Sequence, residues 1–361
     1  MDLKRLQLFH PTTPPLKTLS ESAAAPAPGS QAAAAASTTM KSIRLPNPSY
    51  SFQASSKYGV SCIFDRLRVG CFPVAGRKVI CTDQCGHNVL FDADTHSVVA
   101  MPDLPKPKKL PVSLFSPVDD DAADDGSLFI MERVLHPVGT GQPSHDLEVL
   151  DFRQGRVTCQ LLTPPPYVHE PSYRGTHRTC KIISYAMVGD GSLLCISVNG
   201  KGTYVMDTAT RAWSKAGDWM LPFRGKVEYI PDLKLWFGFS ADDARRLAAA
   251  DLSTMDMDSQ LQLVGCWNKE LHDPPEGEEW MEHQDAKLVY LGSGKFCLAR
   301  FFLKWVIKFG FIKLFHGYFD AFTGVEVVPR GLNGRQVELE MIPYKTTYHT
   351  PVNQVIIEKF F

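Results

Sequence analysis

The chain of 361 residues has no excess of charge, because 38 Lys and Arg residues face 39 Asp and Glu residues and the net charge is −1. Without a basic surplus, no global attraction to nucleic acid or to an anionic membrane is expected. A run of about 18 uncharged apolar residues is also missing, since Lys304, Lys308 and Lys313 interrupt the most apolar stretch. The sequence therefore predicts neither a nucleic-acid partner nor a membrane span.

Recognised catalytic and cofactor motifs are absent as well. No GxGxxG, P-loop or HExxH pattern occurs, and no Ser or Cys nucleophile motif accompanies His272, Asp273 and His283. The nine cysteines stand singly in apolar runs, which is typical of a reducing compartment. The sequence predicts no catalytic residue and no cofactor, and a cytoplasmic or nuclear location is expected.

The N-terminal part offers little that a core would bury. Residues 1–11 read as a short strand, and residues 12–41 are an Ala-, Pro- and Ser-rich segment that is expected to be a disordered linker. The first ten residues lack the apolar core of a secretory signal. An organelle transit peptide is the alternative interpretation, because basic residues outnumber acidic ones in residues 1–41.

A strand that ends on an aspartate and then turns back recurs along the chain. It is clearest at residues 202–213, GTYVMDTATRAW, where the strand ends on Asp207 and the chain returns with Trp213. Weaker copies end on four other aspartates: Asp92, Asp151, Asp251 and Asp320. A carboxylate there accepts hydrogen bonds from backbone N–H groups two residues on, which makes an Asx turn. The five aspartates are therefore predicted to be structural turn residues.

Short antiparallel strands are predicted between these turns. Asn199-Gly200 lies between the apolar runs 193–198 and 203–206, and this arrangement is a strong hairpin signal. Residues 181–188 precede the hairpin and supply a further strand. Four such strands in sequence would make one antiparallel blade.

The spacing of the turns predicts the fold class. Successive turn aspartates lie roughly 45–70 residues apart, near the ~40–50 residues of one propeller blade. We therefore expect an all-β, kelch-like β-propeller of six blades, within a range of five to seven, over residues 42–361. Pairing of the N-terminal strand or of residues 43–64 with the C-terminal strands is expected to close the ring and remove exposed edges.

Cys81, Cys85 and His87 form the best candidate for a metal site. They place three ligand-type side chains within seven residues, but no second pair of ligands stands at a partner spacing. A structural or incidental role is therefore expected for them, and no metal is predicted.

The loop at residues 164–179, PPPYVHEPSYRGTHRT, is dense in aromatic and cationic groups. Such groups are enriched where binding energy concentrates in interfaces, so the loop is a candidate contact site for a partner. Its candidate residues are Tyr167, His169, Tyr173, Arg174 and His177. A solvated loop between blades is the alternative interpretation.

Three stretches carry a resemblance to a known family: FDADTHSVVAMPDLPKPK (91–108), residues 204–240 beginning YVMDTATRAW, and FDAFTGVEVV (319–328). They resemble an uncharacterised plant family of unknown function, expanded in grasses, that is similar to kelch-type and F-box-associated propellers. Trp213 stands where a kelch repeat would have it, whereas the Gly-Gly pair of kelch blades is missing. The resemblance implies a propeller but supplies no catalytic residue.

These observations together favour a binding protein. Repeated scaffold strands with unlike loops predict a non-enzymatic, monomeric module that recognises a protein partner through its rim loops. The alternative is a small-ligand receptor or an enzyme with a site at the central channel of the propeller.

Overall fold

The computed structural model describes most of the chain between residues 69 and 350. The described residues are 8–9, 41–42, 52, 69–83, 85–118, 125–139, 143–153, 155–176, 179–243, 246–253, 263–267, 280–282, 285–308, 312–333 and 336–350. Within them the chain is almost entirely β, and helix is confined to η2 (Pro166–His169) and α1 (Tyr173–Thr176). The all-β prediction is confirmed. Neither helical piece approaches the length needed to cross a membrane.

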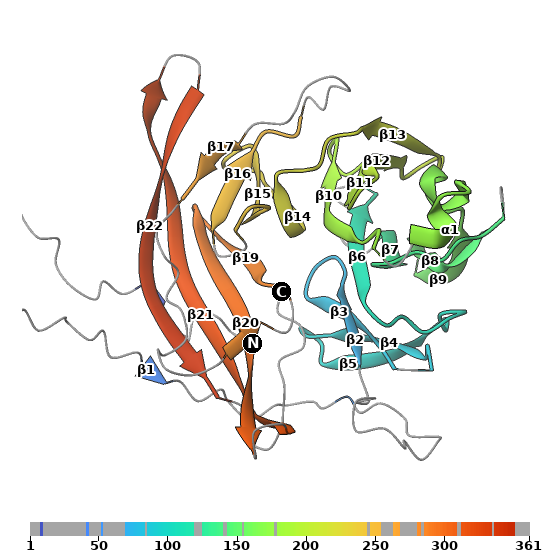
Figure 1. Ribbon diagram of the computed structural model, residues 1–361, viewed down its shortest axis with the longest axis horizontal. Coiled ribbons are helices and arrows are strands. Elements are labelled where there is room, and N and C mark those ends of the chain that lie inside the picture. The colour runs from blue at the N-terminus through green and yellow to red at the C-terminus, as the bar shows by residue number, and fades with distance from the viewer. Residues whose placement is uncertain are drawn as a thin grey trace, which may run out of the picture. The chain divides into compact units, whose positions relative to one another are not determined.

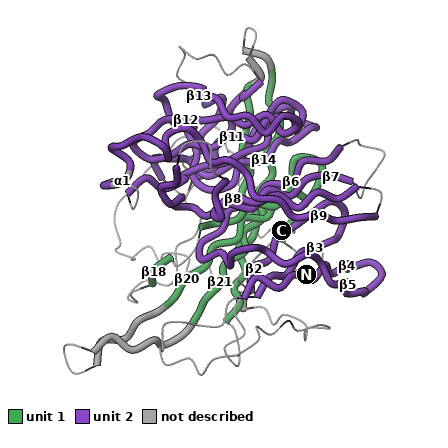
Figure 2. The backbone as a smooth tube through the Cα atoms, turned by 90° about the vertical axis from the view of Figure 1, so that its right-hand side faces the viewer, with its two compact units in different colours: residues 1–46, 271–357 green, residues 47–270, 358–361 purple. Residues whose placement is uncertain are grey.

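The chain divides into two compact units (Figure 2). Unit 1 contains residues 1–46 and 271–357, and unit 2 contains residues 47–270 and 358–361. The single domain expected over residues 42–361 stays a prediction. The linker expected at residues 12–41 lies almost wholly outside the described residues, and so does most of the strand expected at 1–11.

Unit 2 is built from four antiparallel meanders of four strands each (Figure 1). The first two meanders are β2 (Gly70–Pro73), β3 (Lys78–Thr82), β4 (Asn88–Asp92) and β5 (Ser97–Met101), then β6 (Pro111–Pro117), β7 (Gly126–Glu132), β8 (Ser144–Arg153) and β9 (Arg156–Leu162). The other two are β10 (Ile182–Val188), β11 (Leu193–Val198), β12 (Gly202–Asp207) and β13 (Trp213–Gly217), then β14 (Phe223–Ile230), β15 (Leu235–Ser240), β16 (Leu247–Ala250) and β17 (Leu263–Cys266).

The third meander follows the hairpin signals of the sequence. Between β11 and β12, Lys201 N donates to Val198 O at 3.0 Å, and Gly200 and Gly202 have φ values of 69° and 91°. These left-handed conformations favour glycine because it has no Cβ. The predicted reversal at Asn199-Gly200 is therefore present.

Two meanders join into one eight-stranded sheet. Their first strands, β10 and β14, pair in parallel with the register Ser184↔Gly225, Tyr185↔Lys226 and Ala186↔Val227. Each meander keeps its own antiparallel order on either side of this contact. The first strands of these two successive meanders therefore lie next to each other.

Unit 1 departs from this pattern. Its sheet contains β18 (Trp280–Glu282), β19 (Lys287–Gly292), β20 (Lys295–Lys308), β21 (Ile312–Asn333), β22 (Gln336–His349) and β1 (Lys41–Ser42). β20, β21 and β22 have 14, 22 and 14 residues, against four to ten in unit 2. A 22-residue strand is far longer than the usual ~5–6 residues, and it contains Asp320 well inside the strand.

The expected closure of a six-bladed ring is not seen. β1 pairs in parallel with β22, and Lys345 N donates to Leu8 O at 3.2 Å, so N-terminal residues do meet a C-terminal strand within unit 1. The sheets formed by the described residues nevertheless stay four separate open sheets. Most of the 43–64 region lies outside those residues. The count of six blades is therefore not confirmed.

Candidate binding surface

The loop at residues 163–180, called here the tyrosine-anchored loop, is fixed to the core by two aromatic side chains. Tyr167 and Tyr173 are both 0% exposed and belong to the core that the second and third meanders share. Their ring centroids lie 5.2 Å apart at an interplanar angle of 77°, and Tyr167 also contacts Tyr204 at 5.1 Å. Edge-to-face packing of this kind adds stabilisation beyond the buried area.

Hydrogen bonds tie the same loop to the segment 133–139. The hydroxyl of Tyr173 donates to Leu135 O at 2.5 Å, and His169 Nδ1 lies 3.3 Å from Val138 O. Burial raises the pKa of Tyr173 well above its ordinary range, so its hydroxyl stays a donor. These bonds join the described part of the loop to the segment 133–139 at two points.

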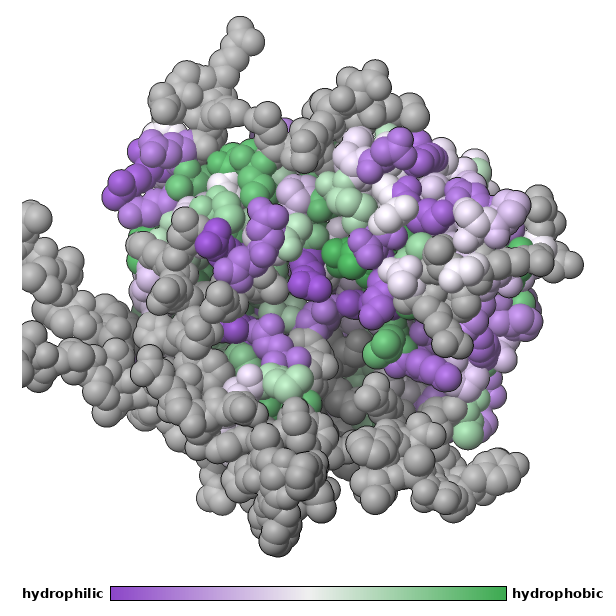
Figure 3. All heavy atoms as spheres, in the orientation of Figure 1, coloured by the Kyte–Doolittle hydropathy of each residue, from purple (hydrophilic) through white to green (hydrophobic). Residues whose placement is uncertain are grey.

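The outer side of the loop is polar. Glu170 and Ser172 are exposed, and His169 is half-buried. Lys201 Nζ, from the β11–β12 turn, lies 2.6 Å from Glu170 Oε2 and 6.0 Å from the centre of the Tyr173 ring. In Figure 3 hydrophilic and intermediate side chains predominate on the side of unit 2 that carries α1 and β9. The loop thus presents charged and hydrogen-bonding groups on a fixed backbone.

The five residues predicted from the sequence have different places. Tyr167 and Tyr173 are buried anchors, so the contact role expected of their side chains does not fit the structure. His169 lies at the surface of the loop. The side chain of Arg174 and the whole of His177 lie outside the described residues.

Beside the loop, His136 and Lys106 meet at a buried carboxylate. His136 Nδ1 lies 2.8 Å from Asp146 Oδ2, and Lys106 Nζ lies 2.9 Å from Asp146 Oδ1. The side chain of Asp146 is 2% exposed, whereas those of His136 and Lys106 are 61% and 43% exposed. Burial opposes the charge of Asp146, but hydrogen bonds from Lys106 and His136 outweigh burial and lower the pKa of this carboxyl.

Lys106 belongs to the basic connector, residues 105–109 between β5 and β6, and a second lysine of this connector lies deeper. Lys108 Nζ lies 2.5 Å from Glu148 Oε1, and both side chains are almost fully buried. Burial raises the pKa of Glu148, and the Lys108 ammonium opposes that rise. Lys109 and Leu110 donate their backbone N–H groups to the Glu132 carboxylate at 2.6 and 3.1 Å. The basic connector therefore runs along a buried acidic row.

Sequence reasoning missed this polar row. The sequence contains one sign of this row, which is that both charged pairs are spaced two residues apart. Asp146 and Glu148 are so spaced in β8, and Lys106 and Lys108 in the connector. Such alternation places side chains on one side of an extended chain. Matching the two required the fold, because about 40 residues separate them in the sequence.

Three of the five recurring aspartates make Asx turns. Asp207 Oδ1 accepts from Ala209 N at 3.0 Å and from Thr210 N at 2.6 Å. Asp92 accepts likewise from the backbone of residues 94 and 95, and Asp251 accepts from Ser253 N at 2.9 Å. Hydrogen bonds from the backbone lower the pKa of Asp92 and Asp207.

Asp151 and Asp320 depart from the predicted turn role. Asp151 lies within β8, where it accepts from Ser127 Oγ at 2.6 Å and pairs with Arg211. Asp320 lies within β21, is 0% exposed, and has no hydrogen-bond partner for either carboxylate oxygen among the described residues. The prediction failed here because each strand continues past its aspartate, to Arg153 and to Asn333, instead of ending on it.

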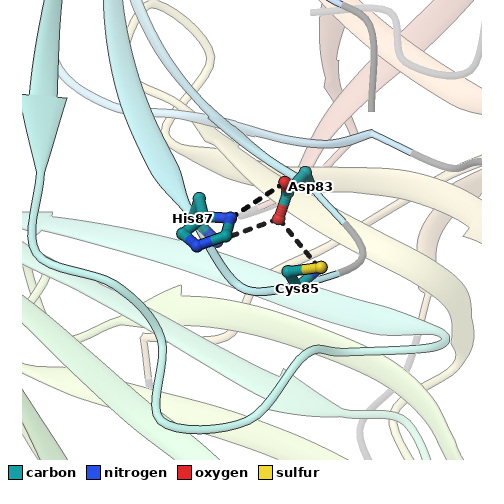
Figure 4. Close-up of side chains that lie close together, drawn as sticks. All are labelled: Asp83, Cys85 and His87. Atoms are coloured by element: carbon teal, nitrogen blue, oxygen red, sulfur yellow. Dashed lines mark hydrogen bonds and ion pairs between the residues drawn. The ribbon is translucent and has the colours of Figure 1, made fainter. Parts of the chain in front are cut away.

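The metal-ligand candidate is rearranged in the structure. Cys81 is buried in β3, and Asp83 instead joins Cys85 and His87, with one ligand atom of each within 4.8 Å of the others (Figure 4). Asp83 Oδ1 accepts from Cys85 N at 2.8 Å and from His87 N at 3.0 Å, and Oδ2 lies 3.0 Å from His87 Nδ1. Burial opposes ionisation of Asp83, but the bonds from His87 and Cys85 outweigh it and lower its pKa.

These hydrogen bonds account for the grouping as an Asx turn between β3 and β4. A carboxylate that already caps two backbone N–H groups needs no ion to fix its position. The geometry therefore agrees with a structural role for this turn. The other histidines considered from the sequence, His272 and His283, lie outside the described residues.

Comparison with known sequences places the chain in a family. A sequence model described as a protein of unknown function, DUF1668, matches residues 1–349. The chain belongs to the DUF1668 family. The resemblance to a family of unknown function is thereby confirmed, while the plant origin and the kelch likeness of this DUF1668 protein stay predictions. No curated protein matches it.

Solved structures give distant similarities to this DUF1668 chain. The Cps50 (Swd1) β-propeller domain of Myceliophteria thermophila has a TM-score of 0.33 and 12% identity, and the match covers 78% of this chain and 98% of that one. A complex of KlAtg21 with the coiled coil of AgAtg16 gives a TM-score of 0.36 and 11% identity, with 70% of each chain covered. The fold of the DUF1668 chain is therefore described from its own strand pairing.

Proposed function

We propose that this DUF1668 protein is a non-enzymatic binding module that holds a protein partner against the tyrosine-anchored loop. The observation that carries the proposal is the loop itself: Tyr167 and Tyr173 are buried in the core, while Glu170 and Ser172 remain exposed. A backbone ordered before binding loses less conformational entropy when a partner docks. The loop therefore combines a fixed shape with chemically varied side chains.

The polar chemistry of this surface favours a partner that offers both hydrogen-bond donors and acceptors. Glu170 and Ser172 supply acceptor oxygens, and the ammonium of Lys201, which is 14% exposed, supplies donors. A folded protein with a mixed polar patch matches that pattern. Interfaces of this kind carry a polar rim with hydrogen bonds around a small apolar centre.

Affinity capture with loop variants tests the proposal. Full-length wild-type protein and the variants Glu170→Arg and Ser172→Trp are immobilised and exposed to an extract of the source organism. We expect the wild type to retain a stoichiometric partner and both loop variants to lose it, because each adds bulk or reversed charge at an exposed position.

The matched control is Asp232→Arg, which makes a similar charge change in the exposed β14–β15 turn. This variant is expected to retain the partner. Equal recovery by all four proteins would show that the tyrosine-anchored loop is not the contact site. Absence of a stoichiometric partner from the wild-type sample would count against a binding module altogether.

A second candidate is a small-ligand receptor or enzyme, and the group formed by His136, Asp146 and Lys106 favours it. A buried carboxylate that orients an exposed imidazole is an arrangement that general acid–base catalysis uses. Ligand-dependent changes in melting temperature test this candidate. A ligand whose stabilising effect disappears in His136→Gln but persists in Glu170→Arg would favour it over the protein-binding module.

A further inference from the structure

Two cysteines face each other across the first hairpin of unit 2. Cys71 in β2 lies directly opposite Cys81 in β3. Cys71 is half-buried and Cys81 is 5% exposed. Side chains of directly opposed residues lie on the same side of a sheet, and the two thiol groups interact. The pair is therefore close in space as well as in register.

The backbone hydrogen bonds between β2 and β3 show whether Cys71 and Cys81 form a hydrogen-bonded or a non-hydrogen-bonded pair. Val74 N donates to Lys78 O at 3.1 Å, which marks a hydrogen-bonded pair at the end of the hairpin. Hydrogen-bonded and non-hydrogen-bonded pairs alternate along antiparallel strands. The register runs without a shift to Cys71↔Cys81, three steps away, which is therefore a non-hydrogen-bonded pair. Pro73, one step from Val74, also falls at such a position, as its missing N–H requires.

This position suits a covalent link. Cα atoms of a non-hydrogen-bonded pair lie about 4.5 Å apart, within the ~4.4–6.8 Å range in which disulfides form. We propose that Cys71 and Cys81 form a reversible disulfide that locks β2 to β3 under oxidising conditions. This property is separate from the proposed binding of a partner.

A peroxide is the oxidant class that the reaction requires. The more exposed Cys71 thiol is oxidised to a sulfenic acid while hydrogen peroxide is reduced and one water leaves. The Cys81 sulfur then attacks the Cys71 sulfur, the S–O bond breaks, and a second water carries away the hydroxyl with the Cys81 proton. Two thiols thus lose two electrons in total, and thiol reductants reverse the link.

The disulfide would fasten an edge of the first sheet. β2 and β5 are the two outer strands of that sheet, and an outer strand is held by neighbours on one side only. A covalent tie from β2 to β3 stabilises the hairpin by restricting the unfolded chain. The oxidised protein is therefore expected to melt at a higher temperature than the reduced protein.

Peptide mapping of the full-length protein tests the link. Reduced protein is treated with hydrogen peroxide, remaining thiols are alkylated, and the chain is digested with trypsin, which cuts after Arg68, Arg77 and Lys78. We expect peptide 69–77 joined to the peptide that begins at Val79, with the two released by dithiothreitol. Cleavage before Asp83 then separates Cys81 from Cys85 and identifies which cysteine is bonded.

Control variants make the outcome decisive. Cys71→Ser should abolish the linked peptides, whereas Cys85→Ser should keep them. Cys159 is an internal control, because it is also half-buried but lies opposite Leu150, and it should stay alkylatable. A bond from Cys71 to Cys85, or full alkylation of Cys71 after peroxide treatment, would overturn the proposal.

Discussion

At the scale of single residues, the environment of a carboxylate decides its role. Asp207 stands at an exposed turn, where backbone N–H groups stabilise its charge and lower its pKa. Asp151 is buried, but a hydrogen bond from Ser127 and an ion pair with Arg211 offset the cost of burying its charge. Asp320 is buried beside the cross-strand residues Phe301 and His349, and burial raises its pKa to about 7. An unpaired buried carboxylate is costly when it is ionised.

The variant Asp320→Asn tests this difference. The pKa of Asp320 is about 7 in the folded protein and about 3.9 in the unfolded chain. Its contribution to stability is therefore fully present below about pH 4 and is lost as the pH rises through about 7. Relative to the variant, the wild type should lose on the order of 4 kcal/mol of unfolding free energy across that window. Urea titrations at several pH values measure the loss.

Asp92→Asn is the matched control, because the pKa of Asp92 is lowered by backbone hydrogen bonds at an exposed turn. Its contribution has the opposite sign: stability is present above the unfolded pKa and is lost as the pH falls through the lower folded pKa. Parallel stability curves for the wild type and Asp320→Asn would contradict the burial argument.

At the scale of elements, the turn between β11 and β12 uses two glycines for different reasons. Gly200 has a φ of 69° and open space around it, whereas Gly202 has a φ of 91° and packs against the neighbouring backbone. A Cβ on Gly202 would lie 2.3 Å from Gly217 O. The first glycine therefore serves the turn, and the second also permits β12 to approach β13.

The variants Gly200→Ala and Gly202→Ala separate these two reasons. Gly200→Ala should cost about 1 kcal/mol, the usual penalty for a left-handed alanine. Gly202→Ala should cost about 3 kcal/mol or more, because main-chain atoms cannot move away from the new methyl group without breaking the β12–β13 ladder. Midpoints of urea unfolding measure both. Equal losses would show that the close approach does not matter.

At the scale of the whole molecule, each of the two compact units contains buried clusters of its own. Buried clusters centred on Phe129, Phe223 and Phe72 lie within residues 47–270. Another cluster, which includes Phe302, Phe319 and Tyr348, lies within residues 271–357. Units with their own cores commonly unfold in separate transitions.

A fragment of residues 47–270 is therefore expected to fold by itself. Among the described residues, its strands β2–β17 pair only with one another, so the ladders between these strands are kept when the rest of the chain is removed. Circular dichroism should show a β spectrum, and calorimetry should show a cooperative transition. A fragment without cooperative melting would mean that unit 1 is required for folding.

Many of the turns in unit 2 could be predicted from the sequence, because they depend on residues close together in the chain. Asn199-Gly200, Asp92 and Asp207 act within a few residues of the chain, so their turns were visible in the sequence. The anchoring of Tyr167 and the meeting of Lys106 with Asp146 join segments about 40 residues apart. Such contacts depend on how strands are ordered, and no local pattern reports that order.

The sequence by itself determined the all-β class and the short reversals, because strand alternation and turn residues act over a few neighbouring positions. The tertiary structure alone decided which polar groups became buried. Asp320 and Asp207 follow similar apolar strands in the sequence, yet one is 0% exposed and the other caps an open turn. Burial depends on what packs over a strand, and long-range packing sets that.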